Sequence, residues 1–93
     1  MAKRIKSSGN VFSDMGFTKP AAENLKIRSA LMMQVEKYIK NHKLTQTQAA
    51  KQLGIDQPRL NKLLKGRIDL FTIDRLVEML AKVSVNVKLE IAA

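Results

Sequence analysis

The sequence of 93 residues is long enough for one domain, but a chain of this length buries only about two thirds of its unfolded surface, so a partner subunit would help to stabilise it. It holds 17 Lys and Arg residues against 8 Asp and Glu residues, a formal charge of +9 that favours a polyanionic partner. The absence of cysteine excludes disulfides and thiolate metal sites, and no apolar run approaches the roughly 20 residues of a membrane span.

The first ten residues, MAKRIKSSGN, combine three cations with small polar residues. Such a composition buries too little apolar surface to offset the entropy of ordering it, so we predict a mobile basic arm over residues 1–10. The arm either lies along a DNA groove, docks on a partner or is simply solvated, and we favour the solvated terminus. No apolar stretch of signal-peptide length follows the cations, so we expect a cytoplasmic protein.

The next segment, residues 11–17, places four large apolar side chains within seven positions: Val11, Phe12, Met15 and Phe17. Side chains of this kind are not left in water without cause, so we expect the segment to pack onto the body of the domain. Two interpretations stay open, because these apolar anchors could fill the protein's own core or an interface with a partner protein.

A long helix is predicted from residue 20 to about residue 41, because Pro20 suits a first helical turn and apolar residues then recur at three-to-four spacing. These residues are Leu25, Leu31, Met32, Val35, Tyr38 and Ile39. The other face carries cations that we expect to be solvated, namely Lys26, Arg28, Lys37 and Lys40. The single histidine, His42, follows without a second metal ligand nearby, so we predict no metal site.

Residues 45–66 have the pattern of two short helices joined by a tight turn. Thr45 and Gln48 are spaced as a capping box, which predicts that the first helix begins at about Gln46. Gly54 is expected to end that helix, because glycine adopts a positive φ at no steric cost.

The second helix of this pair is predicted to begin after Asp56, a favoured capping residue, with Pro58 in its first turn and Gly66 at its end. Small and apolar residues fall where two crossed helices would share a core: Ala49, Ala50, Leu53, Ile55, Leu60 and Leu63. Residues 44–66 carry four cations and one carboxylate, a net charge of +3. A helix-turn-helix with a basic second helix is typical of DNA-binding proteins.

Residues 44–66, LTQTQAAKQLGIDQPRLNKLLKG, resemble the helix-turn-helix of phage-repressor or XRE-type regulators. The resemblance implies base readout by Gln57, Pro58, Asn61 and Lys62, and phosphate contacts by Gln46, Arg59, Lys65 and Arg67. Side-chain chemistry agrees, since Gln57 can bond adenine through two hydrogen bonds and Lys62 can reach guanine. Pro58 departs from the polar residue usual at its position and can offer only an apolar contact, such as one to a thymine methyl group.

After this motif, Thr72 is expected to cap a helix over residues 73–82, with Phe71 and Leu76 as a hydrophobic staple. Residues 83–91 then alternate between apolar and polar side chains, which predicts a half-buried β-strand. Its apolar members are Val83, Val85, Val87, Leu89 and Ile91. Because no other segment alternates comparably, we expect the same strand of a second copy to be its partner, in a homodimer.

The sequence thus predicts one mostly α-helical domain over residues 11–93: a phage-repressor-like bundle of about four helices with a C-terminal β-strand that pairs across a dimer. The segments NVFSDMGF and ENLKIRSALM, the helix-turn-helix and the terminal strand together resemble HigA-type antitoxins of the XRE class, over about residues 10–91.

That resemblance implies a repressor of its own operon, bound to double-stranded DNA, which also neutralises a RelE/HigB-like ribonuclease toxin. The predicted twofold dimer presents two recognition helices, so we expect a palindromic operator. A stand-alone XRE-family or phage regulator without a toxin partner remains the alternative. We find no convergent nucleophile, base or metal set, and we expect neither enzyme activity nor a cofactor.

Overall fold

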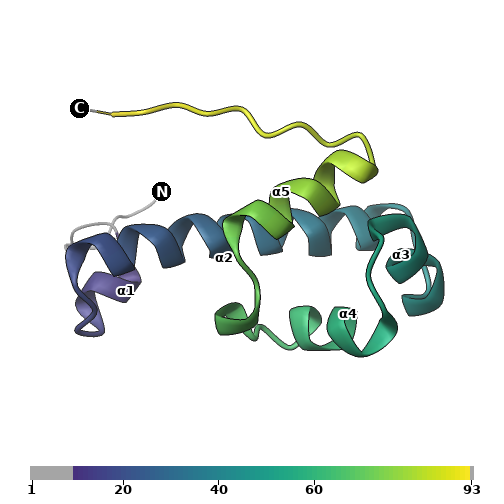
Figure 1. Ribbon diagram of the computed structural model, residues 1–93, viewed down its shortest axis with the longest axis horizontal. Coiled ribbons are helices and arrows are strands. Elements are labelled where there is room, and N and C mark those ends of the chain that lie inside the picture. The colour runs from purple at the N-terminus through teal and green to yellow at the C-terminus, as the bar shows by residue number, and fades with distance from the viewer. Residues whose placement is uncertain (1–9, 93) are drawn as a thin grey trace.

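The computed structural model describes residues 10–92 and contains five α-helices and one short 3-10 helix within that range. In chain order they are α1 (Val11–Asp14), α2 (Lys19–Asn41), α3 (Gln46–Leu53), α4 (Gln57–Leu64), η1 (Ile68–Leu70) and α5 (Ile73–Lys82), and Figure 1 labels the five α-helices. None of these helices has both the length and the apolar character that crossing a bilayer requires. The predicted mostly helical fold is confirmed.

Helix α2 is the central element, since α1, η1 and α5 all pack along it. Its 23 residues extend over about 35 Å at the usual helical rise, close to the 40 Å length of the molecule. The helix begins one residue before Pro20, because the side chain of Thr18 accepts a hydrogen bond from the amide of Ala21 and caps it. Its end at Asn41 is as predicted.

The basic face of α2 is not uniformly solvated, contrary to the expectation from the sequence. The guanidinium of Arg28 is half-buried and donates to the backbone oxygen of Ile68 at 3.3 Å and to the side-chain oxygen of Asn24 at 2.6 Å. Arg28 therefore ties α2 to η1, a contact between segments 40 residues apart in the sequence.

Asn10 belongs to the folded domain, although the sequence placed it in the arm. Its side-chain oxygen accepts hydrogen bonds from the amides of Phe12 and Ser13 and so caps α1, and its side-chain nitrogen donates to Glu23 on α2. This buried residue fixes the start of α1. The rest of the predicted arm, residues 1–9, lies outside the described range.

The prediction that residues 11–17 pack onto the body holds for only one of the four apolar side chains. Phe12 is half-buried and makes an edge-to-face contact with Phe17, at 6.3 Å between ring centroids. By contrast, Val11, Met15 and Phe17 are 61%, 66% and 46% exposed. Helix α1 has a single turn, so only one of its sides can face α2.

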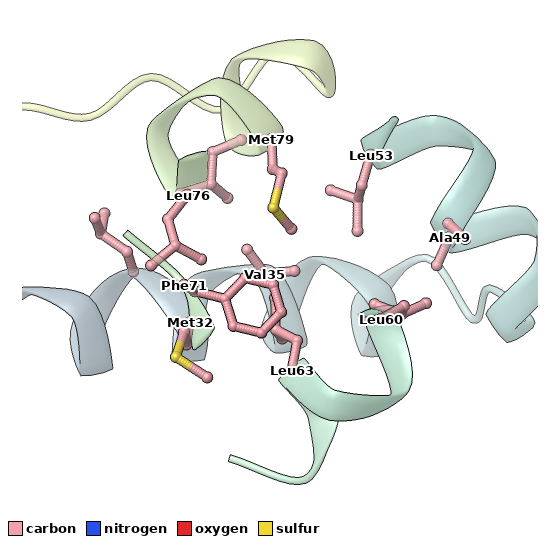
Figure 2. Close-up of a cluster of buried hydrophobic side chains, with 12 residues drawn as sticks. Met32, Val35, Ala49, Leu53, Leu60, Leu63, Phe71, Leu76 and Met79 are labelled. Atoms are coloured by element: carbon pink, nitrogen blue, oxygen red, sulfur yellow. The ribbon is translucent and has the colours of Figure 1, made fainter. Parts of the chain in front are cut away.

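One hydrophobic core joins α2, α3, α4 and α5, as Figure 2 shows. Its fully buried large side chains are Val35, Leu53, Leu60, Phe71, Leu76 and Leu80. Phe71 and Leu76 flank the capping residue Thr72 at the start of α5, so the predicted hydrophobic staple is confirmed. This core fixes the two motif helices against α2.

Helices α2, α3, α4 and α5 all end in the same way. In each, one residue with positive φ follows the helix: Lys43, Gly54, Gly66 and Ser84. The amide of the next residue donates to a carbonyl five residues earlier, with N···O distances of 2.9 to 3.1 Å, which is the Schellman motif. At three of the four ends that next residue is apolar and packs against the core, as Leu44, Ile55 and Val85 do.

This ending of α5 corrects the predicted strand, which was expected to begin at Val83. Val83 and Ser84 form the turn that ends α5, and the amide of Val85 donates back to Leu80. Beyond this turn the chain runs as an extended segment alongside the N-terminal half of α2 (Figure 1). No strand is assigned within residues 10–92, and strand pairing across a dimer stays a prediction.

Candidate nucleic-acid interface

Helices α3 and α4 form the predicted helix-turn-helix. The capping box at α3 is complete, since the amide of Gln48 donates to the Thr45 hydroxyl at 3.1 Å and the Gln48 side chain accepts from the Thr45 amide at 2.9 Å. Gly54 ends α3 with a φ of +77°. Asp56 then caps α4 by accepting from the amide of Arg59 at 2.8 Å. Residues of the motif itself, Gly54 and Asp56, thus fix both ends of the three-residue turn between the helices.

The two faces of α4 differ sharply in exposure. Leu60 and Leu63 are buried in the core and fix the orientation of the helix. At 100° per residue, the opposite face carries Pro58, Asn61, Lys62 and Lys65, and Gln57 lies at the edge of this face, at the first position of the helix. All five side chains are exposed. The structure therefore brings together on one surface the four residues proposed for base readout and one of those proposed for phosphate contact.

The remaining three phosphate candidates lie around this face. Gln46 is exposed at the first position of α3. Arg59 lies on the flank of α4, where its guanidinium carbon is 5.5 Å from the centroid of the Phe71 ring, a cation–π contact. Arg67 lies three residues beyond the end of α4, directly before η1.

Arg67 forms an exposed ion pair with Asp69, at 3.3 Å between Nη2 and Oδ2, with a second hydrogen bond from Nε. The hydrogen bonds from the Arg67 guanidinium lower the pKa of the Asp69 carboxyl below its ordinary value. An exposed pair of this kind contributes little to stability, so a DNA phosphate can compete with Asp69 for Arg67.

Sequence reasoning missed Thr47, which contacts Gln57, one of the proposed base-reading residues. The side-chain nitrogen of Gln57 donates to the Thr47 hydroxyl at 2.8 Å. Thr47 is the second residue of α3 and Gln57 is the first of α4, so the bond connects the exposed N-terminal ends of the two motif helices. Only the crossing of the helices brings them together, and no pattern in the sequence signals it.

A second polar contact, between Tyr38 and Gln52, attaches the motif to α2. The Tyr38 hydroxyl donates to the side-chain oxygen of Gln52 on α3 at 2.9 Å. His42 stacks on the Tyr38 ring, with 4.1 Å between ring centroids, and its Nδ1 lies 2.9 Å from the Tyr38 backbone oxygen. The histidine therefore helps to order the end of α2. Among residues 10–92, no three metal-ligating side chains gather.

Comparison with known protein families agrees with this geometry. A family model described as a helix-turn-helix domain matches residues 11–92, from α1 to the extended C-terminal segment. No curated protein shows a significant match to the chain. The match spans nearly all of the sequence and includes the α3–turn–α4 unit with its exposed basic face. The chain therefore belongs to this family of helix-turn-helix domains and has the architecture of a DNA-binding regulator.

Proposed function

We propose that the protein is a sequence-specific transcriptional repressor that binds a palindromic operator as a homodimer. The observation that supports this most is the exposed face of α4, which carries amide and ammonium groups on a helix held rigidly by buried leucines. Side-chain amides and ammonium groups form the hydrogen bonds by which proteins distinguish base edges in the major groove. The protein would act in the cytoplasm by binding alone, without catalysis and without a cofactor.

The direct test of this function compares operator DNA with random DNA. Gln57→Ala and Lys62→Ala should each weaken operator binding by about 1 to 3 kcal/mol while affecting random-sequence binding much less, because each removes a base contact. Arg67→Ala should weaken both and reduce the slope of log affinity against log salt concentration by about one unit, because it removes a phosphate contact. Fluorescence anisotropy over a range of salt concentrations measures all three effects.

Lys19→Ala is the matched control for lost charge, because Lys19 is an exposed cation at the first position of α2, at the end of that helix away from the motif (Figure 1). It should leave the preference for the operator unchanged. Equal weakening of operator and random DNA by Gln57→Ala and Lys62→Ala would show that the exposed face of α4 does not read the sequence.

The dimer is supported by the extended C-terminal segment, residues 86–92. Val87, Leu89 and Ile91 are 44%, 78% and 83% exposed, and the segment forms no backbone hydrogen bond to other described residues. It borders a groove of about 590 Å³ whose other wall includes Ile27 and Leu31 of α2. Residues 67–93 hold four cations and four carboxylates, and this neutral composition suits a subunit contact better than a DNA face. A twofold dimer would read half-sites about 34 Å apart.

A second function, toxin neutralisation, is favoured by the exposed apolar surface around α1. Val11 and Met15 are exposed on the same short segment as Phe12, and Phe12 itself lines a groove of about 250 Å³. The other apolar lining residues of this groove are Met32, Met33, Leu63, Leu64 and Ile68. A protein docked there would leave the base-reading face of α4 free. Together with the resemblance to HigA-type antitoxins, this surface supports a role as the antitoxin of a RelE/HigB-like ribonuclease toxin.

The antitoxin role is tested with the double variant Val11→Ser/Met15→Ser, since both side chains are exposed and their loss spares the core. Wild-type protein should co-purify with the product of the neighbouring reading frame and relieve its toxicity on co-expression. The double variant should lose both properties and keep its melting temperature and operator binding. If the double variant still neutralised the toxin, the toxin would have to contact another surface of the protein. If the wild-type protein bound no such partner, it would be a stand-alone regulator.

A further inference from the structure

We propose that Thr47 is the positioning residue that orients Gln57 for base readout, an inference that rests on the proposed function. The observation is the 2.8 Å hydrogen bond from the Gln57 side-chain nitrogen to the Thr47 hydroxyl. Both residues are exposed, so core packing does not hold the long Gln57 side chain in place. The bond to Thr47 does so instead.

The chemistry of the carboxamide decides what this bond leaves available. A glutamine side chain offers two N–H donors and one oxygen acceptor. Thr47 takes one donor, so Gln57 retains one N–H and its oxygen. These are the groups that pair with N7 and the N6 amino group of adenine in the major groove. The bond to Thr47 and the two bonds to adenine are compatible when Thr47 accepts from the N–H that points away from the amide oxygen, because adenine pairs with the oxygen and the N–H on its side.

Thr47 is well suited to hold another side chain because it is itself fixed. A β-branched side chain has few rotamers in a helix, and Thr47 lies in the first turn of α3, within the capping box formed by Thr45 and Gln48. Helix α3 is in turn anchored to the core by Ala49, Ala50 and Leu53. A glutamine whose rotamers are restricted before DNA arrives loses less conformational entropy on binding and discriminates better between bases.

The test uses short DNA duplexes that the wild-type protein selects from a random library, together with duplexes carrying each single-base change across a half-site. Thr47→Val keeps the shape of the side chain and removes the hydroxyl. It should reduce the preference for the favoured base at the position read by Gln57 by about two- to tenfold, the effect of one hydrogen bond. Binding to random DNA and the melting temperature should stay unchanged, and Thr47→Ser, which keeps the hydroxyl, should retain the preference.

A double-mutant cycle separates positioning from direct DNA contact. In a Gln57→Ala background, Thr47→Val should cause no further loss, because no side chain is left to orient. If Thr47→Val weakened random and selected DNA equally, or acted just as strongly in the Gln57→Ala background, Thr47 would touch DNA itself and the inference would be overturned. The inference would also be overturned if the Thr47→Val variant discriminated between bases as well as the wild-type protein does. A wild-type protein that selects no sequence would instead overturn the proposed function, and the inference with it.

Discussion

Replacing Phe71 by alanine is expected to lower the free energy of unfolding by about 3 to 5 kcal/mol. The Phe71 ring is 1% exposed and lies among Val35, Leu63 and Leu76, as Figure 2 shows. Its removal leaves a cavity where α2, α4 and α5 meet, and it also removes the ring on which Arg59 lies. Because a small domain has only about 5 to 15 kcal/mol of stability in total, part of the variant should be unfolded at physiological temperature.

Urea unfolding followed by circular dichroism measures this loss. The matched control is Met33→Ala, which also truncates a large apolar residue but at a site that is 63% exposed on α2. Exposed substitutions of this kind change stability by about 0.5 kcal/mol or less. If both variants unfolded at the same urea concentration, the assignment of Phe71 to the centre of the core would be wrong.

Replacing Val87 by proline is expected to convert the proposed homodimer into monomers. Proline has no amide hydrogen to donate and is confined to edges and bulges of β-sheets, so it should prevent residues 86–92 from pairing with a second copy. Operator affinity should then fall by about 100-fold or more, because each monomer carries one recognition helix and the gain from simultaneous binding of two half-sites is lost.

Light scattering measures the mass of the variant, and anisotropy measures its affinity for the operator. Val87→Thr is the control, because threonine keeps the amide donor and is itself common in strands. It should stay dimeric. Since Val87 lies outside the core, the helical circular dichroism signal of both variants should match that of the wild type. An unchanged dimer mass for Val87→Pro would place the subunit contact on another surface.

The helix-turn-helix could be predicted from sequence because its determinants are local. The capping box at Thr45, the positive φ at Gly54 and the cap at Asp56 each depend on residues within a few positions of one another. The first motif helix begins at Gln46 and the last helix spans residues 73–82, both as predicted. Short-range hydrogen bonding and apolar spacing were sufficient to fix these boundaries.

The features that the sequence did not predict depend on distant contacts or on competition between local patterns. Arg28 was expected in solvent because its acceptor on Ile68 lies 40 residues away. Thr47 gained its contact with Gln57 only through the crossing of two helices. The alternation from Val83 onward suggested a strand, but packing of Val85 on the core favours a Schellman ending with Ser84 in the left-handed region.

The shared ending of four helices has a consequence for how such a protein can diverge. At three of these helix ends a partly buried apolar residue packs against the core, namely Leu44, Ile55 or Val85, so an added or deleted residue there would disturb that packing. The outward side chains of α4, such as Asn61 and Lys62, contribute nothing to that packing. Point substitutions on the exposed face of α4 can therefore change the preferred DNA sequence without disturbing the core, whereas packing constrains the lengths of the turns between helices. Duplicated copies of the protein can in this way come to bind different operators while they keep the same fold.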